Sequence, residues 1–303
     1  MDVYLPIANL SVNGLVIVAL GGLTGLLSGM FGVGGGFLTT PLLIFYGIPP
    51  TVAAASASTQ VTGASVTGVL AHSKRRGVDY HMGGIIVAGG LLGTGLGALL
   101  FRFFQAAGQI DVIISALYVL MLGTIGAMMA REALQSLRGA SVSGKAAPKR
   151  RHHPLVAALP LRRRFYRSGL YISPLAPLVL GVFVGILTML MGVGGGFILV
   201  PAMLYILGMS AGVVVGTSLF NILFVTVATT MMHSLTTKAV DIVLVAFLLI
   251  GSVTGVQIGA QVAQKFKPEV LRLALAVIVL LVAFRMLFGL GFQPDEIFTV
   301  QPL

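Results

Sequence analysis

Long apolar segments follow one another through most of this chain and limit the folds open to it. Runs of about twenty or more mostly apolar residues recur between Leu15 and Leu290, each long enough to cross about 30 Å of hydrocarbon as a helix. Hydrophobic residues make up 57% of the 303, charged residues 9%, and the mean hydropathy is +1.02. A soluble domain could not bury so much apolar surface. The sequence therefore predicts an all-α polytopic membrane protein whose apolar helices contact the lipid bilayer.

Positive charge is concentrated in one segment. Ten of the 19 Lys and Arg residues lie between Arg131 and Arg167, and the formal net charge is +11. Basic residues gather in cytoplasmic loops of membrane proteins, so we expect this segment to set topology from the cytoplasmic side of the cell (inner) membrane. No nucleic-acid partner is expected; a regulatory or partner-binding loop is the alternative. The sequence has no cysteine, which excludes disulfides, thiolate metal sites and a cysteine nucleophile.

The two halves of the chain repeat one another. When Gly21–Phe45 is aligned without gaps with Gly181–Tyr205, ten of 25 positions are identical, including Gly-Val-Gly-Gly-Gly-Phe and a later proline in both copies. Further along, Ser56 aligns with Thr217, and Gln60 aligns with Asn221. Glycines spaced by four residues then coincide at 89, 93 and 97 and at 251, 255 and 259, a spacing typical of closely packed transmembrane helices.

This repeat divides the chain into an N-terminal membrane repeat (1–130), a basic linker (131–172) and a C-terminal membrane repeat (173–303). The linker is expected to be an exposed loop, because Ser, Gly and Pro interrupt its basic residues and no apolar run is long enough to span. Each repeat begins with a glycine-interrupted segment, at 15–47 and 175–208. Three transmembrane helices follow in each, near 50–72, 82–104 and 110–130, and near 211–233, 239–264 and 270–290.

The interrupted segments decide the symmetry of the molecule. Four glycines in five positions disfavour a continuous helix, so we expect two half-helices that meet inside the membrane. If each pair returns to its own side as a re-entrant hairpin, each half has three net crossings and the repeats are inverted. If each pair crosses fully, the repeats run parallel. The positive-inside rule favours inversion, with both termini outside and the linker in the cytoplasm.

The duplicated glycines are the first candidate binding residues. Close helix packing would explain one copy, but paired broken helices in two halves typically mark a transporter site. The second half-helix of each pair would present free backbone N–H groups and the positive end of its dipole, which together favour an anion. The residues predicted to bind a small anionic substrate in this way are Gly34, Gly35, Gly36, Gly194, Gly195 and Gly196.

Polar side chains of the next span are the second group of candidates. Ser56 and Gln60 lie one helical turn apart, and Thr217 and Asn221 are their counterparts in the second half. Hydroxyls and amides can donate hydrogen bonds to an oxyanion without placing a fixed charge in the bilayer. Hydrogen bonding between helices is the alternative interpretation.

Two further pairs match across the halves. His72 and His233 lie near helix ends and are weighed as gating or proton-coupling residues against ordinary interfacial histidines. Asp79 and Asp241 each precede a helix, where capping is favoured over such a coupling role. Neither pair forms a metal-ligand cluster, no catalytic constellation is found, and no cofactor is expected, so the sequence does not predict an enzyme.

At these residues the chain resembles the sulfite exporter TauE/SafE family, also called the toluenesulfonate uptake permease family. The resemblance covers nearly the whole membrane portion and rests on the duplicated Gly-Val-Gly-Gly-Gly-Phe-x-x-x-Pro and on Gly216-Thr217-Ser218, which the first half replaces by Ala55-Ser56-Ala57. It implies transport of sulfur-containing anions such as sulfite, sulfoacetate or other organosulfonates across the cytoplasmic membrane.

Energetics favour export. An inside-negative potential expels a monovalent anion with about 2.3 kcal/mol per 100 mV, and no acidic residue lies deep in a predicted span that could couple import to protons. Proton-coupled uptake and a passive anion channel on the same scaffold are the alternatives. The sequence leaves the anion, the coupling ion and the oligomeric state open.

Overall fold

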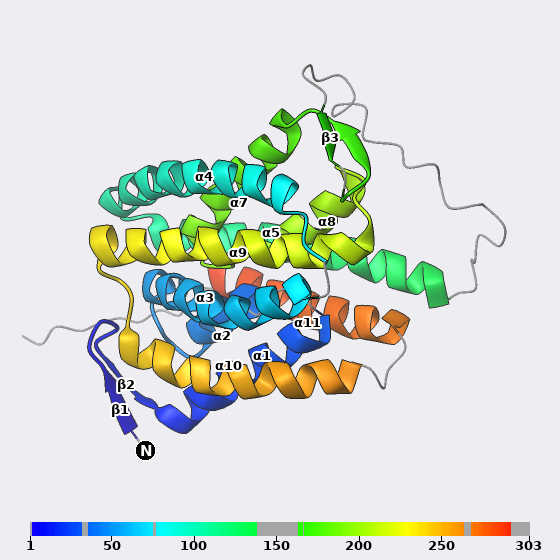
Figure 1. The fold of residues 1–303 in the computed structure, drawn as a ribbon. Coiled ribbons are helices and arrows are strands. Elements are labelled where there is room, and N and C mark those ends of the chain that lie inside the picture. Colours follow the sequence, from blue (N-terminus) through cyan, green and yellow to red (C-terminus); the bar gives the residue numbers. More distant parts are fainter. Residues whose placement is uncertain are drawn as a thin grey trace, which may run out of the picture.

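The computed structural model describes residues 2–31, 36–74, 77–137, 163–165, 167–263 and 268–291 and is mostly helical (Figure 1). In the first half a helix of 18 residues and one of ten lie where the glycine-interrupted segment is predicted, and three long helices follow. Their bounds are α1 Gly14–Phe31, α2 Gly36–Phe45, α3 Pro50–Lys74, α4 Tyr80–Ala106 and α5 Ile110–Leu137.

The second half repeats this order, so the predicted sequence of elements is confirmed in both halves. The third helix of this half, α9, is followed directly by a single π-helical turn, η1. The bounds are α7 Leu175–Met191, α8 Gly196–Tyr205, α9 Ala211–Met232, η1 His233–Thr237, α10 Ile242–Ala263 and α11 Pro268–Gly291.

Five helical segments in the described part of the chain are long and apolar enough to cross a membrane: Tyr80–Ala106, Ile110–Gln135, Gly212–Thr237, Ile242–Gly259 and Leu273–Gly291. Together with the shorter apolar helices α1, α2, α7 and α8 they agree with a multi-pass membrane protein. Helix α3 is not among the five, although it has 25 residues. Its alanines at 53, 54, 55 and 57 are fully buried, so much of its surface faces protein. A helix in such a position can consist of small residues such as Ala, Ser and Thr and does not need the large apolar side chains that contact lipid.

Two short hairpins depart from the all-α prediction. Strands β1 (Asp2–Leu5) and β2 (Leu10–Asn13) pair before α1, and strands β3 (Arg163–Phe165) and β4 (Leu170–Ile172) pair before α7. The second hairpin lies in the segment predicted to be an exposed loop. That expectation is wrong for these strands, because Phe165, Leu170 and Ile172 are buried in a core with α7 and α8 residues.

The first helix of each half packs against the second of the three long helices of the other half. A Cβ atom on Gly21 or Gly25 of α1 would meet the carbonyl oxygen of Leu248 or Ser252 of α10 at 2.5 or 2.4 Å. The equivalent glycines of α7, 181 and 185, approach the carbonyls of Ile86 and Gly90 of α4, in each case at 2.2 Å. The predicted glycine spacings therefore permit backbone contact between helices.

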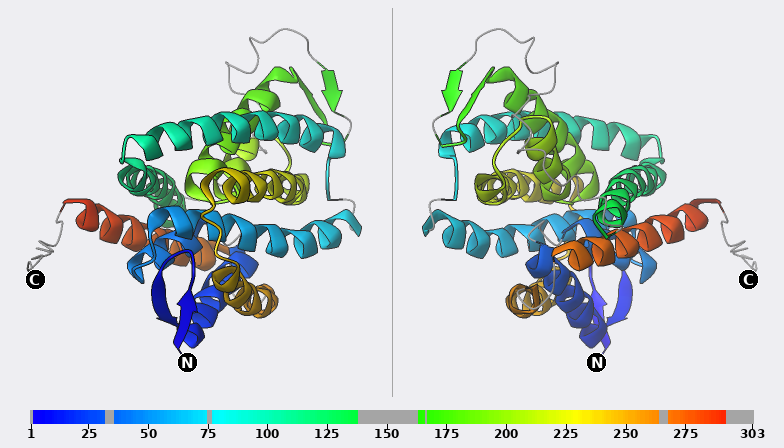
Figure 2. Two further views of the ribbon diagram at one scale, coloured as in Figure 1. Left: turned by 90° about the vertical axis from the view of Figure 1, so that its left-hand side faces the viewer. Right: turned by 90° about the vertical axis from the view of Figure 1, so that its right-hand side faces the viewer.

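Helices α3 and α9 cross between these two pairs and run in opposite directions. The hydroxyls of Thr59 and Thr230 lie 3.2 Å apart, and Thr62 donates to Thr226 at 2.8 Å, so rising residue numbers in α3 meet falling numbers in α9. Figure 2 shows α4 and α7 on one side of this crossing and α1 and α10 on the other. The middle of the molecule is thus built from equivalent helices of the two halves.

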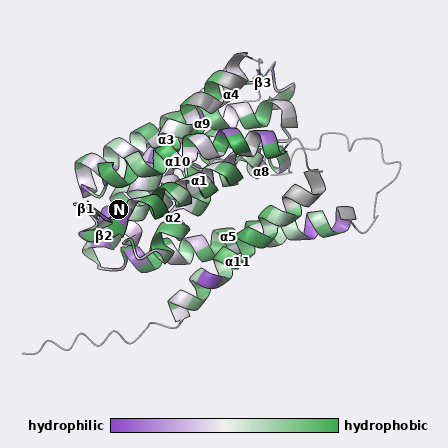
Figure 3. Cartoon of the chain, turned by 90° about the horizontal axis from the view of Figure 1, so that it is seen from below, coloured by the Kyte–Doolittle hydropathy of each residue, from purple (hydrophilic) through white to green (hydrophobic). Residues whose placement is uncertain are grey.

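Helices α5 and α11 pack together on one side of the other helices, as Figure 3 shows from below. Gly126 of α5 approaches Leu280 of α11, where a Cβ atom would lie 3.0 Å away. Large exposed apolar side chains such as Leu120, Leu281 and Phe284 cover their outer surfaces. A bilayer, and not water, is the solvent that suits such surfaces.

Candidate functional site

The glycine motif interrupts the helix in the second half, as predicted. Helix α7 ends at Met191, and Gly192, Gly194 and Gly195 have φ values of 73°, 74° and 75° before α8 begins at Gly196. These left-handed conformations are strained for any residue with a Cβ atom. In the first half α2 begins at Gly36, while Gly34 and Gly35 lie outside the described residues.

The break in the second half lies at the crossing of α3 and α9. A Cβ atom on Gly192 would lie 2.0 Å from the carbonyl oxygen of Ala54 in α3, and one on Gly194 would lie 3.2 Å from Ile222 in α9. Gly36, where α2 begins, approaches this break directly, because its Cβ would lie 2.8 Å from the carbonyl oxygen of Val193. The starts of α2 and α8 are therefore close neighbours.

Two aromatic rings hold these starts together. Phe37 and Phe197 occupy the same position of the two motifs, and their rings stack with centroids 4.4 Å apart and planes 4° from parallel. Both side chains are buried. The stack links the first turns of α2 and α8 at the centre of the molecule.

The free backbone groups of the two helix ends at the break have different hydrogen-bond partners. At the carbonyl end of α7, Met191 accepts a hydrogen bond from the Tyr118 hydroxyl at 2.7 Å, and the His233 ring Nε2 lies 3.0 Å from the Met189 oxygen. At the amide end of α8, the N-cap residue is Gly195, which has no side chain that could cap the helix, while its carbonyl accepts from the Ile198 and Leu199 N–H groups at 3.1 and 2.8 Å. The first N–H groups of a helix have no partner within it. The break therefore presents donors and the positive end of a dipole, which suits an anion better than a cation.

Buried polar side chains without partners lie on both crossing helices. Gln60 of α3 and Asn221 of α9 are 1% and 0% exposed, and the Gln60 Oε1 and both amide atoms of Asn221 have no hydrogen-bond partner. Ser218 of α9, which the sequence analysis does not select as a ligand, is 1% exposed, and its Oγ also has no partner. Unpartnered buried polar groups are costly and rare. A ligand in the interior would explain them.

Asn221 lies near the break. Its Oδ1 would be 3.5 Å from a Cβ atom on Gly90 of α4, and Gly90 in turn contacts Gly185 of α7. The neighbouring Val184 is the side chain that a Cβ atom on Gly195 would meet, at 2.2 Å. Asn221 and the start of α8 are thus joined by contacts through α4 and α7.

Ser56 and Thr217 already have partners in the other half. The Thr217 hydroxyl accepts from the Asp79 backbone N–H at 3.0 Å, and the Ser56 hydroxyl accepts from that of Asp241 at 3.2 Å. Both side chains are fully buried. These equivalent bonds fix α9 to the start of α4 and α3 to the start of α10.

Asp79 and Asp241 cap helices, the role that the sequence favours for them. One carboxylate oxygen of Asp79 accepts from the His81 and Met82 N–H groups, each at 3.1 Å, and Asp241 caps α10 at the same distances. The other oxygen of Asp79 accepts from the N–H and hydroxyl of Ser168, beside β4, and that of Asp241 accepts from the Ile7 N–H in the β1–β2 turn.

The histidine pair is described in one half only. His233 is fully buried where α9 passes into η1, with Nδ1 3.2 Å from the Thr237 hydroxyl and Nε2 against the α7 carbonyl end. It is therefore not a solvated histidine. The side chain of His72, near the end of α3, lies outside the described part of the structure.

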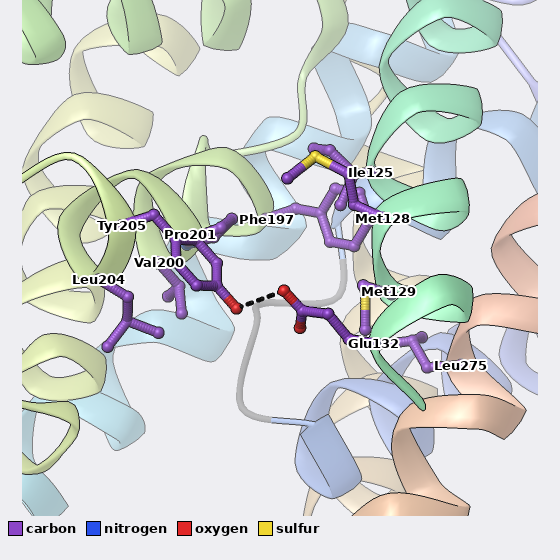
Figure 4. A pocket seen from close by; sticks show the side chains of 10 residues that line it. All are labelled: Ile125, Met128, Met129, Glu132, Phe197, Val200, Pro201, Leu204, Tyr205 and Leu275. Atoms are coloured by element: carbon purple, nitrogen blue, oxygen red, sulfur yellow. Dashed lines mark hydrogen bonds between the residues drawn. The ribbon is translucent and has the colours of Figure 1, made fainter. Parts of the chain in front are cut away.

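A cavity of about 230 Å³ lies on the far side of α8, and its lining residues come from α5, α8 and α11. Figure 4 shows the Tyr205 hydroxyl donating to Glu132 across it, at 2.8 Å. Apart from this pair the lining is apolar, and Glu132 supplies negative charge without a cationic side chain. The cavity is therefore a poor site for an anion, and the candidate site is the break itself.

Comparison with known proteins connects this geometry to a family. Residues 17–286 match the family described as Sulfite exporter TauE/SafE. The chain is 27% identical over 279 residues to the Bacillus subtilis (strain 168) protein named "Probable membrane transporter protein YjnA", covering 89% of this chain and 98% of that protein. No solved structure gives a significant match.

Relatives occur in distant organisms. A "Probable membrane transporter protein" of Xylella fastidiosa (strain 9a5c) is 26% identical, covering 83% of this chain and 85% of that protein. "Probable membrane transporter protein MJ0441" of Methanocaldococcus jannaschii is 24% identical, covering 87% and 91%. The chain thus belongs to the sulfite exporter TauE/SafE family, a family of membrane transporters and not of enzymes.

Proposed function

We propose that this protein carries small sulfur-containing anions, such as sulfite, sulfoacetate or other organosulfonates, out of the cell across the cytoplasmic (inner) membrane, without a cofactor. The anion is held by the N-termini of α2 and α8, which begin at the two glycine motifs. Gln60 and Asn221 add side-chain donors from the crossing helices. Ser56 and Thr217 set the positions of these helices through their bonds to Asp241 and Asp79.

One observation carries this proposal. A helix N-terminus without a side-chain cap begins at Gly196, in the interior, at the crossing of α3 and α9, where buried polar atoms of Gln60, Ser218 and Asn221 have no partner. The carbonyl end of the same break is occupied by Tyr118 and His233. The remaining helix end is therefore the positive one, which favours an anion, and the Asn221 Nδ2 and the Ser218 hydroxyl can donate to it.

We infer further that the halves are inverted repeats, with the 131–172 linker in the cytoplasm and both termini outside. The opposite directions of α3 and α9 support this, since equivalent helices related by an axis in the membrane plane must run in opposite directions. The concentration of Lys and Arg in the linker agrees with it. Figure 1 shows the N-terminus and β3 at opposite ends of the long helices.

The negative charge of the substrate favours export. The membrane potential drives a monovalent anion outward with about 2.3 kcal/mol per 100 mV, so a carrier needs no coupling ion for this direction. Import would need one. The carboxylates of Asp79 and Asp241 are engaged as helix caps.

The test is efflux of isotopically labelled sulfite and sulfoacetate from proteoliposomes that contain the purified full chain, with and without an imposed potential. We expect saturable efflux that an outward-driving potential accelerates and that Asn221→Leu reduces at least tenfold. Glu132→Gln, in the apolar cavity, should transport as the wild type does. Side-chain variants are preferable to glycine variants, because a Cβ atom on Gly195 would collide with Val184.

Other results would separate the alternatives. Efflux that does not saturate would indicate a channel, and uptake driven by a pH gradient would indicate a proton-coupled permease. If a well-folded preparation moves neither anion, the assignment to sulfur oxyanions is wrong.

A further inference from the structure

Two unpartnered polar side chains share one face of α9. Ser218 and Asn221 are three residues apart, so their side chains are neighbours on the helix surface. They are 1% and 0% exposed, and the Ser218 Oγ, the Asn221 Nδ2 and the Asn221 Oδ1 have no hydrogen-bond partner. Other buried hydroxyls of α9 are satisfied within the helix, as Thr229 is by the Val225 carbonyl at 2.8 Å. The two side chains thus differ from the other polar residues of the helix.

A glycine lets helix α4 pack closely against the amide-bearing face of α9. Gly90 of α4 faces Asn221, and a Cβ atom there would lie 3.5 Å from Oδ1 and 2.4 Å from Val225. Gly90 also contacts Gly185 of α7, next to Val184 and the start of α8. Ile222, which follows Asn221 in α9, lies directly against the break, 3.2 Å from a Cβ atom on Gly194. This part of α9 is therefore next to the segment that leads into α8.

The unpartnered atoms include an acceptor as well as donors. The Asn221 Nδ2 and the Ser218 hydroxyl can donate, but Oδ1 can only accept. Because both amide atoms lack partners, rotating the amide by half a turn still leaves one donor and one acceptor unpaired. Gln60, the counterpart of Asn221 in the other half, also has an unpaired acceptor, Oε1. An anion that offers only acceptor oxygens would leave these amide oxygens buried and facing negative charge.

We propose that the site selects singly charged oxyanions that carry an O–H group of their own, such as a protonated oxyanion or a hydroxyalkylsulfonate. The negative oxygens accept from the α8 N-terminus, the Ser218 hydroxyl and the Asn221 Nδ2. The ligand's own donor is accepted by the Asn221 Oδ1. This proposal rests on the proposed function and narrows its substrate class.

The experiment uses two probes with the same charge and nearly the same size, 2-hydroxyethanesulfonate and ethanesulfonate. Each competes with labelled sulfite for efflux from proteoliposomes containing the full chain. We expect the hydroxylated probe to inhibit at concentrations at least tenfold lower, equivalent to about 1.4 kcal/mol of discrimination. In Asn221→Leu, which removes donor and acceptor at similar side-chain volume, the preference should fall to about one. Thr229→Val, two turns further along the same helix, is the matched control and should keep it.

The outcomes separate this proposal from the function on which it rests. Equal inhibition by the two probes in the wild type, with sulfite still transported, would overturn the donor requirement and leave the anion carrier intact. A requirement for Na⁺ without a preference between the probes would assign the amide oxygens to a cation and also overturn it. Absence of sulfite efflux from folded protein would contradict the proposed function itself.

Discussion

At the scale of single residues, Gly192 shows how the break depends on glycine. Its φ is 73°, and a Cβ atom would lie 2.0 Å from the backbone oxygen of Ala54. We expect Gly192→Ala to destabilise the protein by more than the ~1–2 kcal/mol that the left-handed conformation costs alone, because α3 must also move. The measurement is the fraction of protein that stays monodisperse in detergent after heating.

Gly95 of α4 provides the matched control. A Cβ atom there would meet nothing within 4 Å, so Gly95→Ala should leave thermal stability unchanged or raise it by up to ~1 kcal/mol, as alanine is the better helix former. Equal losses in the two variants would mean that the geometry of the break is not what requires glycine.

A variant of Ser218 can distinguish a role in substrate binding from a role in folding. Its hydroxyl makes no hydrogen bond, so Ser218→Ala removes no internal bond and relieves an unpaired buried group, which costs about 1–3 kcal/mol. We expect unchanged or higher thermal stability together with at least fivefold slower sulfite efflux. If efflux in this variant equals that of the wild type, the hydroxyl does not contact the substrate.

Amides are easier to select as candidates from the sequence than hydroxyls. Gln60 and Asn221 were found because they match across the repeat in apolar helices, where an amide is conspicuous. Ser218 has no counterpart, since residue 57 is alanine, and serines in membrane helices are common. Whether a hydroxyl is satisfied depends on its neighbours in space. The partners of Ser56 and Thr217 lie 185 and 138 residues away.

At the scale of elements, each hairpin is held by an aspartate that caps a helix of the other half. The Asp79 carboxylate bonds the start of α4 with one oxygen and Ser168 beside β4 with the other. We expect Asp79→Ala to lower stability by at least the ~0.5–2 kcal/mol of an N-cap and to loosen the β3–β4 hairpin. Limited trypsin digestion should then cut faster after Arg163 and Arg164, as followed by fragment mass.

Asp241 gives the control for this effect. Asp241→Ala removes the same kind of cap and the bond to Ile7 in the first hairpin, so a similar loss of stability is expected. Cleavage after Arg163 and Arg164 should stay at the wild-type rate. Equal acceleration in both variants would indicate general unfolding and not release of one hairpin.

The long helices were predictable, and the hairpins were not. Apolar runs and glycine periodicity give helices whose bounds in the structure lie within a few residues of the predicted ones, except that α5 extends to Leu137, seven residues beyond its predicted end. The strands have three or four residues each, too short for an alternating pattern to be recognised. Their burial comes from packing beneath helices that are distant in sequence, so the linker composition alone pointed to a loop.

At the scale of the whole molecule, the two halves are interlocked and do not form separate domains. Helix α1 packs on α10, α7 on α4, α3 on α9 and α5 on α11, so every one of these pairs joins one half to the other. The hydrogen bonds from Asp79 and Asp241 also cross between halves. Neither half could therefore keep its buried surface without the other, and the starts of α2 and α8 meet only when both halves are present.

Because the halves are interlocked, the orientation of one half relative to the other in the membrane is the property to test. The sequence has no cysteine, so a single introduced cysteine reports on its own position. Single cysteines can be placed at the exposed residues Ser11, Gln135 and Ser234, in β2, near the end of α5 and in η1. With inverted repeats, a membrane-impermeant maleimide should label Ser11→Cys and Ser234→Cys in intact cells, and Gln135→Cys only after permeabilisation. With parallel repeats and a cytoplasmic linker, all three would be protected until the membrane is opened. Labelling of Gln135→Cys alone in intact cells would place the linker outside. The basic residues would then lie outside the cell, opposite to the side that the positive-inside rule predicts.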